Sequence, residues 1–255
     1  MITRFRGLWL AVPPGVFRPR SDAARLLDVV EPRIRGEVLD VCTGSGVLAL
    51  SVASRADAVT AIDASRLAVH AARLNARLNR QRITVLQGDL LAPVAGRRFD
   101  VIISNPPYLP TPPDQPQTRA AKAWNAGEDG RAVLDDLCAT APAHLNEGGE
   151  VVIVQSSLSG VQRTRTLLET AGLRAIVLAE ETGPLGPIAT ARLAHLHQRG
   201  LVCRDDPREQ IVVIAGVKSG PAVPELHLGN RSLGVEPESG LSGSVAGVSG
   251  SGRPG

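Results

Sequence analysis

Four consecutive residues, Asn105, Pro106, Pro107 and Tyr108, have types and spacing that predict chemistry. Two prolines remove two backbone N–H donors and push the residue before each of them toward extended geometry, which makes the loop stiff. The side-chain oxygen of Asn105 and the carbonyl of Pro106 can each accept one hydrogen from an amide or an exocyclic amine. The ring of Tyr108 offers a face for stacking. The pattern therefore predicts a receptor for a planar NH₂ group.

Such a run can also be a simple proline-rich turn, since short motifs often match by chance. Its position favours the functional interpretation, because it directly follows residues 99–104, an apolar run typical of a buried strand. Open parallel sheets place their sites beyond the carboxyl ends of their strands. We therefore expect this loop to lie at a site.

A second candidate site is the segment 38–48, in which a strand-like run leads through small residues into the start of a helix. Its glycines, Gly44 and Gly46, allow a ligand to approach the backbone near the positive end of that helix. The signal is weak by itself, because the G-x-G-x-x-G spacing is incomplete and Cys42 stands where a first glycine is expected.

Acidic residues strengthen this interpretation, because Asp40, Asp63 and Asp89 come at the ends of three successive predicted strands. Asp63 can accept hydrogen bonds from both hydroxyls of a ribose, and Asp89 can accept one from an adenine amino group. Asp40 can orient the glycine turn or meet a cationic amine. Each Asp singly could equally cap a helix, but three in succession predict a site for a cofactor that contains a nucleoside.

Hydrophobic periodicity predicts the elements that must position these residues. Strands are expected over 37–41, 58–62, 83–87, 100–104, 150–155, 174–178 and 210–215, and helices over 47–55, 65–79, 131–145, 160–171 and 188–199. This alternation is typical of an α/β fold with a doubly wound, mostly parallel seven-stranded sheet, whose last strand enters antiparallel. Ser21 and Asp22 are expected to cap a helix that reaches Val30.

The domain prediction has three parts: an N-terminal extension with a capping helix over 1–35, one catalytic domain over 36–216, and a disordered tail rich in Gly, Ser and Pro over 217–255. The segment 109–124, rich in proline and threonine, is expected to form a loop over the site.

Composition excludes several classes of protein. No apolar stretch can span a bilayer and no signal peptide follows Met1, so we expect a cytoplasmic protein without membrane contact. Cys42, Cys138 and Cys203 are too widely spaced for a disulfide framework or a zinc site, so no metal is expected. The net charge of +3 comes almost entirely from scattered arginines, and their clusters lack the interleaved aromatic residues that stack on bases.

Taken in order along the chain, 40–46, Asp63, Asp89 and 105–108 resemble the S-adenosylmethionine-dependent methyltransferases of the HemK type, the release-factor glutamine methyltransferases. Segments 16–22 and 123–131 also resemble stretches peculiar to that family. The resemblance covers about 15–216 and implies a Rossmann-like methyltransferase fold. With only about 35 residues before the first strand, the chain is similar to the compact branch without the N-terminal helical domain.

The resemblance implies a role for each matching residue. It assigns cofactor binding to Asp40, Cys42, Gly44, Gly46, Asp63, Asp89, Leu90 and Asn105. Asp40 and the two glycines would line the methionine part, Asp63 the ribose, and Asp89 with Leu90 the adenine. Catalysis would fall to Asn105, Pro106 and Tyr108, with Pro107 completing the substrate site. Two residues depart from the family pattern: Cys42 replaces a glycine, and Ala23 replaces a hydroxyl residue that could bond the cofactor.

The resemblance further implies that the acceptor is a glutamine in the Gly-Gly-Gln loop of a peptide-chain release factor and that a small zinc-binding protein acts as activator. Because an amide nitrogen is a poor nucleophile, we expect catalysis by alignment and by hydrogen bonds that strengthen in the transition state.

The residues alone leave other functions open. A nucleic-acid methyltransferase acting on adenine N6 or guanine N2 uses a similar loop on a flipped base. Gly44, Gly46 and Asp63 could also serve the dinucleotide of an NAD-dependent dehydrogenase, although that would leave 105–108 unexplained. A third alternative is a non-catalytic relic that binds partners. An NH₂ receptor fixes the atom type but does not distinguish a glutamine from a lysine, another amide, a base or a small molecule.

Overall fold

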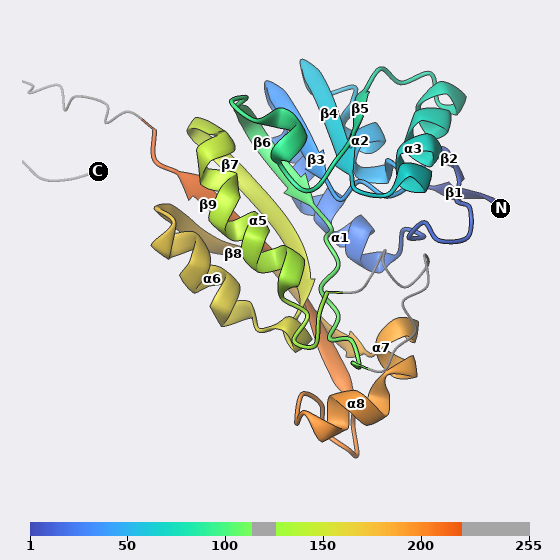
Figure 1. Cartoon of the computed structure of the whole chain (residues 1–255), viewed down its shortest axis with the longest axis vertical. Coiled ribbons are helices and arrows are strands. Elements are labelled where there is room, and N and C mark those ends of the chain that lie inside the picture. Colours follow the sequence, from blue (N-terminus) through green and yellow to red (C-terminus); the bar gives the residue numbers. More distant parts are fainter. Residues whose placement is uncertain (114–125, 221–255) are drawn as a thin grey trace, which may run out of the picture. The chain divides into compact units, whose positions relative to one another are not determined.

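The computed structural model describes residues 1–113 and 126–220, and its centre is a seven-stranded sheet with the order β5-β4-β3-β6-β7-β9-β8 (Figure 1). The strands are β3 (Glu37–Val41), β4 (Ala58–Asp63), β5 (Thr84–Gln87), β6 (Phe99–Ser104), β7 (Leu145–Ser156), β8 (Leu173–Pro184) and β9 (Arg208–Lys218). The first five of these strands pair in parallel, whereas β9 runs antiparallel to both β7 and β8. The predicted doubly wound, mostly parallel fold is confirmed.

Helices cover both faces of the sheet, because parallel neighbours require crossover connections. One face packs against α1 (Ser21–Val30), α2 (Val47–Val52) and α3 (Arg66–Leu78), and the other packs against α5 (Ala132–Thr140) and α6 (Val161–Thr170). Along β3, Val38 contacts the first layer and Leu39 the second, and both are fully buried. Burial on both faces explains why the central strands read as continuous hydrophobic runs.

An N-terminal hairpin of β1 (Ile2–Phe5) and β2 (Leu8–Ala11) was not predicted. It attaches to α3 through backbone groups: Asn79 exchanges hydrogen bonds with Trp9, and Asn75 exchanges them with Ala11 at 2.7 and 3.1 Å. Because the partners on β2 are peptide groups, this attachment leaves no pattern in the side chains of the hairpin.

Several predicted boundaries were wrong in detail, including those of β7 and β8, which are longer than the strands expected over 150–155 and 174–178. The helix expected over 131–145 ends at Thr140 and continues as the 3₁₀ turn η3 (Ala141–His144), because Pro142 lacks the N–H that an α-helix needs. The helix expected over 188–199 is two short helices, α7 (Pro187–Ala191) and α8 (Leu193–Gln198), which meet at Arg192. The last strand continues to Lys218, beyond the expected end of the domain. Three further 3₁₀ turns are η1 (Glu31–Arg33), η2 (Ala92–Val94) and η4 (Ser157–Ser159).

Two predictions fall outside the described residues. The loop expected over 109–124 is described only as far as residue 113, and the tail expected over 217–255 only as far as residue 220. The division into extension, catalytic domain and tail therefore stays a prediction. Within residues 1–113 and 126–220, no helix combines the length and apolar character required to cross a membrane.

Candidate functional site

The polar residues predicted to act together follow four neighbouring strands. Asp40 lies in β3, Asp63 ends β4, Asp89 comes shortly after β5, and Asn105 directly follows β6. These strands are adjacent and parallel, so their carboxyl ends meet at one edge of the sheet. The sequence therefore brings the two halves of the candidate site to the same edge.

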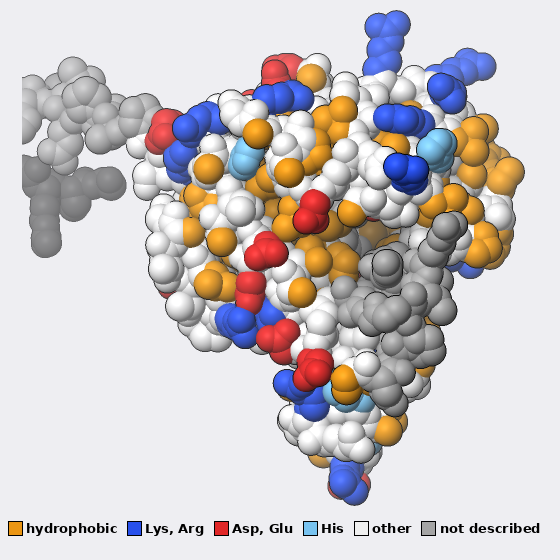
Figure 2. All heavy atoms as spheres, viewed as in Figure 1, with side chains coloured by type: hydrophobic (Ala, Val, Ile, Leu, Met, Phe, Trp, Pro, Cys, Tyr) orange, Lys and Arg blue, Asp and Glu red, His pale blue; other side chains and the backbone are white. Residues whose placement is uncertain are grey.

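A cavity of about 540 Å³, which we call the first cavity, opens at this edge. Its wall includes the predicted cofactor residues Cys42, Gly44, Asp63, Asp89 and Leu90. The wall also includes Phe17 and Pro107, but not Asp40, Gly46 or Asn105. Hydrophobic side chains gather near the middle of the face shown in Figure 2. The volume is that of an ordinary small-molecule site.

Backbone N–H groups fix the carboxylate of Asp63 on the wall of the first cavity. Its Oδ2 accepts from Gly44 and its Oδ1 from Ser65, both at 2.8 Å. Burial raises the pKa of Asp63, and these two bonds oppose that shift. Each oxygen keeps a further lone pair, so the carboxylate can still accept hydroxyl groups. Asp89 is exposed on the same wall, and its side chain has no hydrogen-bond partner among the described residues.

Asp40 lies beneath the glycine turn and is fully buried. Its Oδ2 accepts from the hydroxyl of Thr43 at 2.5 Å and from the N–H of Ala49 at 3.0 Å. Burial raises the pKa of Asp40 to about 7, although both hydrogen bonds oppose the shift. Of the two roles that the sequence left open, these contacts favour orientation of the turn.

Cys42 and Gly46 both have a positive φ, but a side chain meets a different obstacle at each position. Cys42 has a φ of 61°, in the left-handed region that costs a side chain about 1–2 kcal/mol. A glycine would adopt this backbone conformation without that cost. Gly46 has a φ of 83°, and a Cβ there would lie 3.1 Å from the Cβ of Ala72 in α3. Gly46 thus allows α2 to begin against α3.

Asp22 of α1 holds residues 105–108, the predicted receptor for an NH₂ group, which we call the acceptor loop. Its Oδ2 accepts one hydrogen bond from Nδ2 of Asn105 at 3.0 Å and another from the hydroxyl of Tyr108 at 2.9 Å. Since a carboxylate oxygen that receives two donors acts only as an acceptor, the NH₂ end of Asn105 must face Asp22. The Oδ1 of Asn105 then faces away from Asp22. The predicted capping by Ser21 and Asp22 is wrong, because the helix begins without a side-chain cap bond.

The acceptor loop separates two cavities. Pro107 lines the first cavity, whereas Tyr108 lines a second cavity of about 280 Å³ together with Asp22. Tyr108 is 9% exposed and packs within the core layer under α5, so its predicted stacking role stays a prediction. Burial, and after it the neighbouring Asp22, raises the pKa of the Tyr108 hydroxyl, which therefore remains a hydrogen-bond donor.

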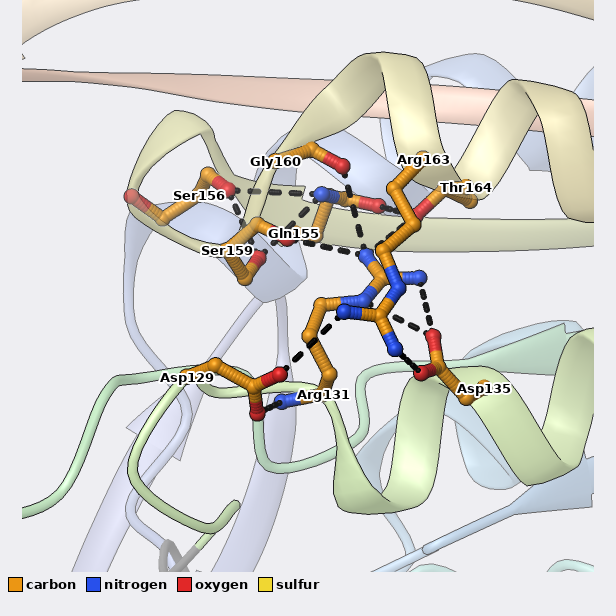
Figure 3. A network of polar contacts seen from close by, with 9 residues as sticks. All are labelled: Asp129, Arg131, Asp135, Gln155, Ser156, Ser159, Gly160, Arg163 and Thr164. Atoms are coloured by element: carbon orange, nitrogen blue, oxygen red, sulfur yellow. Dashed lines mark hydrogen bonds and ion pairs between the residues drawn. The ribbon is translucent and has the colours of Figure 1, made fainter.

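Gly130, in the segment that leads into α5, packs closely against the acceptor loop. A Cβ on Gly130 would lie 2.4 Å from the carbonyl oxygen of Tyr108, so only glycine allows this close approach. The next residue, Arg131, is 2% exposed; its guanidinium donates to Asp135 at 2.6 Å and to the hydroxyl of Thr164 at 2.6 Å (Figure 3). These contacts fix residues 126–131 between α5 and α6, and through Gly130 they support the acceptor loop.

Sequence reasoning missed three of these residues as parts of the site. Asp22 carried a signal, an acid beside a predicted helix start, but capping was the more common explanation. Phe17 lines both cavities and comes from a segment that was noted only through the family resemblance. The position of Arg131 depends on contacts with α6, which no local pattern predicts.

A doubly wound sheet with a ligand-sized cavity over a glycine turn is the architecture of nucleotide-cofactor enzymes of the Rossmann-like class. The E. cuniculi Mtq2–Trm112 complex shares this fold, with a TM-score of 0.57 and 21% identity over 80% of this chain and 99% of that chain. A T. thermophilus 16S rRNA methyltransferase bound to AdoMet and guanosine also shares it, with a TM-score of 0.56 and 20% identity over 85% of this chain and 49% of that chain.

The model of the methyltransferase small domain family matches residues 7–182. A putative protein N5-glutamine methyltransferase of Methanocaldococcus jannaschii is 35% identical over 70% of this chain and 91% of its own length. A release factor glutamine methyltransferase of Streptomyces coelicolor is 36% identical over 62% of this chain, which spans 61% of that relative. The chain belongs to the methyltransferase small domain family and, within it, to the HemK type.

Proposed function

We propose that this protein binds S-adenosylmethionine in the first cavity. Membership of a methyltransferase family supports this, as does the fold neighbour that holds AdoMet. The residues fit such a ligand: apart from Gly44 and its chain neighbours, no atom lies within 4 Å of the point to which a Cβ of Gly44 would project, which leaves room against the backbone. Asp63 would hold the ribose, Asp89 and Leu90 the adenine, and Cys42 and Gly44 the methionine part.

The acceptor nitrogen would bind at Asn105. When bound, the cofactor supplies an electrophilic methyl group. Asn105 Oδ1 and the Pro106 carbonyl would accept the two hydrogens of the acceptor NH₂ and align its lone pair with that methyl group. As the nitrogen gains positive charge, both hydrogen bonds would strengthen and lower the barrier. The nitrogen would release one of its two protons once the methyl group has been transferred, which gives the neutral methylated amide. The observation that carries this proposal is the pair of bonds to Asp22, because they turn Asn105 Oδ1 away from α1.

The proposed acceptor is the side-chain amide of a glutamine in a protein. Within that class, the proposed substrate is a peptide-chain release factor. Relatives named as release factor glutamine methyltransferases support this choice, as does a ribosomal protein uL3 glutamine methyltransferase of Bradyrhizobium diazoefficiens that is 33% identical over 58% of this chain and 53% of its own length. All of these names share one chemical group, a glutamine amide in a protein. A planar NH₂ receptor suits that group.

A small zinc-binding activator is the proposed partner, in analogy to the Mtq2–Trm112 complex. Three leucines of α3, Leu67, Leu74 and Leu78, are each more than 40% exposed, and Trp9 of the adjoining hairpin is 50% exposed. Apolar side chains this exposed on neighbouring elements are typical of an interaction surface.

Coexpression with such an activator should raise the solubility and the turnover of the protein, and Leu74→Asp should abolish both gains.

The Asn105→Ala variant tests the acceptor site. We expect it to bind S-adenosylmethionine as the wild type does, because Asn105 is not part of the wall of the first cavity. Its turnover should fall by about 100-fold or more, since the oriented acceptor oxygen is lost. Asn146→Ala is the matched control, because Asn146 also makes a side-chain bond, to Asp100, away from both cavities. Turnover by Asn105→Ala at the control's rate would contradict the proposal.

A further inference from the structure

Residues 185–207 form a lobe that interrupts the β8–β9 hairpin. The two strands pair as far as Pro184 and Arg208, and the chain between these residues contains α7 and α8 (Figure 1). The match to the family model ends at residue 182, before the lobe begins. Because β8 runs parallel to the central strands, its end brings the lobe to the same edge of the sheet as the acceptor loop.

The buried carboxylate of Glu209 attaches the start of the lobe to the sheet. Glu209 is 7% exposed; its Oε1 accepts from the N–H of Gly186 at 2.7 Å, and its Oε2 accepts from the hydroxyl of Ser156 at 2.6 Å. A small hydrophobic core of Leu158, Ala189 and Leu196 joins both helices of the lobe to η4, the turn that follows β7. The lobe is therefore packed against the sheet and is a fixed part of the fold.

Arg192 connects the lobe directly to the acceptor loop. It lies at the junction of α7 and α8, is 5% exposed, and donates from Nη1 to the carbonyls of Leu109 and Pro110 at 3.1 and 3.0 Å. Burial lowers the pKa of Arg192. These carbonyls directly follow Tyr108, so the lobe helps to set the course of the chain that leaves the acceptor loop.

The second cavity lies between the lobe and the acceptor loop. Pro187, Ile188 and Ala189 of α7 form part of its wall, and Tyr108 and Asp22 form another part. The same Asp22 and Tyr108 form the hydrogen bonds that orient the acceptor loop. The cavity thus borders the acceptor loop through Asp22 and Tyr108.

We propose that α7 and the second cavity recognise the acceptor polypeptide by taking up an apolar side chain next to the methylated residue. This inference rests on the proposed function, and it adds a specificity element that the family match does not include. The carboxylates in the wall already have partners: Glu209 as described, Asp22 with the acceptor loop, and Glu181 with Arg25. The free surface between them is mostly apolar, with Phe17, Leu109, Ile188 and Ile211 contributing.

An apolar side chain fits this wall better than a cationic one, although the exposed Arg20 also lines the cavity. A cationic side chain would have to compete for carboxylates that already accept hydrogen bonds, and a buried charge without a partner is costly. A cavity of about 280 Å³ has room for a side chain but is small for a nucleotide or a cofactor.

The test compares Ile188→Trp with Ala191→Trp. Both residues lie on α7, but Ile188 lines the cavity, whereas Ala191 is exposed outside it. The full chain is incubated with labelled S-adenosylmethionine and a protein extract, and KM is then measured with the purified protein that is labelled most. The thermal midpoint and the dissociation constant for S-adenosylmethionine are measured for each variant.

The indole of Ile188→Trp should fill the cavity and raise KM for the acceptor protein by about tenfold or more, with unchanged affinity for S-adenosylmethionine. Ala191→Trp should keep the wild-type KM. The inference is overturned if Ile188→Trp keeps KM within twofold, or if only a small molecule or a nucleic acid is labelled. If the labelled residue is not a glutamine but KM still rises, the proposed acceptor fails and the inference holds.

Discussion

Asp22, near the start of α1, accepts a hydrogen bond from the side-chain amide of Asn105, although the two residues are separated by 83 positions in the sequence. The same oxygen accepts the hydroxyl of Tyr108, so one carboxylate holds both ends of the acceptor loop. This arrangement directs the NH₂ end of Asn105 toward Asp22 and leaves its carbonyl oxygen free for the proposed substrate amide. Helix α1 is thereby part of the proposed acceptor site as well as of the fold.

Asp22→Ala should lower kcat by about 100-fold, because Asn105 loses the bond that sets its orientation. Asp22→Asn should lower kcat much less, since its amide oxygen can still accept hydrogen bonds from both donors. The free energy of unfolding should fall for Asp22→Ala by about 1–3 kcal/mol, because two donors are left without a partner. Steady-state kinetics and denaturant unfolding measure the two effects. Equal kcat values for Asp22→Ala and Asp22→Asn would show that Asp22 does not orient the loop.

Gly130→Ala should destabilise the protein more than Gly127→Ala. Both glycines have a positive φ, 74° and 80°, so both alanine variants pay a similar cost in backbone conformation. Only at Gly130 would the new Cβ meet the carbonyl oxygen of Tyr108, at 2.4 Å, whereas at Gly127 the nearest atom is 3.6 Å away. We expect a difference of about 1–3 kcal/mol in the free energy of unfolding, together with a lower kcat for Gly130→Ala. Identical stabilities would argue against this support of the loop.

The stability of the protein should depend on pH through Asp40. Burial raises the pKa of this carboxyl from 3.8 to about 7 on folding. Between these two values the folded chain binds more protons than the unfolded chain, so the free energy of unfolding should fall as pH rises from about 4 to 7. Asp40→Asn cannot titrate and should lose this part of the slope. Denaturant unfolding of both proteins at pH 5 and pH 7 is the measurement, and parallel profiles would rule out a raised pKa at Asp40.

The sheet could be predicted from the sequence because its signal is local. Seven hydrophobic runs gave seven strands, and the acids at their ends identified the edge that carries the first cavity. The N-terminal hairpin could not be found in this way, because Trp9 and Ala11 are held through their peptide groups. Asp22 was interpreted as a helix cap, since its true partners, Asn105 and Tyr108, lie far along the chain.

The geometry of the lobe was also beyond local reasoning. A helix was expected over 188–199, but it is divided at Arg192, whose side chain makes tertiary contacts with Leu109 and Pro110. Tertiary contacts of this kind override helix propensity, and they decide which cavity a helix lines.

The central claim is that the oriented amide of Asn105 directs a methyl group onto the nitrogen of a protein glutamine. The most direct test is mass-spectrometric location of the methyl group after the wild-type protein, its activator and a release factor are incubated with labelled S-adenosylmethionine. We predict a single methyl group on the side-chain nitrogen of the glutamine in the Gly-Gly-Gln loop, and none with Asn105→Ala. A methyl group on a nucleic-acid base, or equal glutamine labelling by Asn105→Ala, would contradict it.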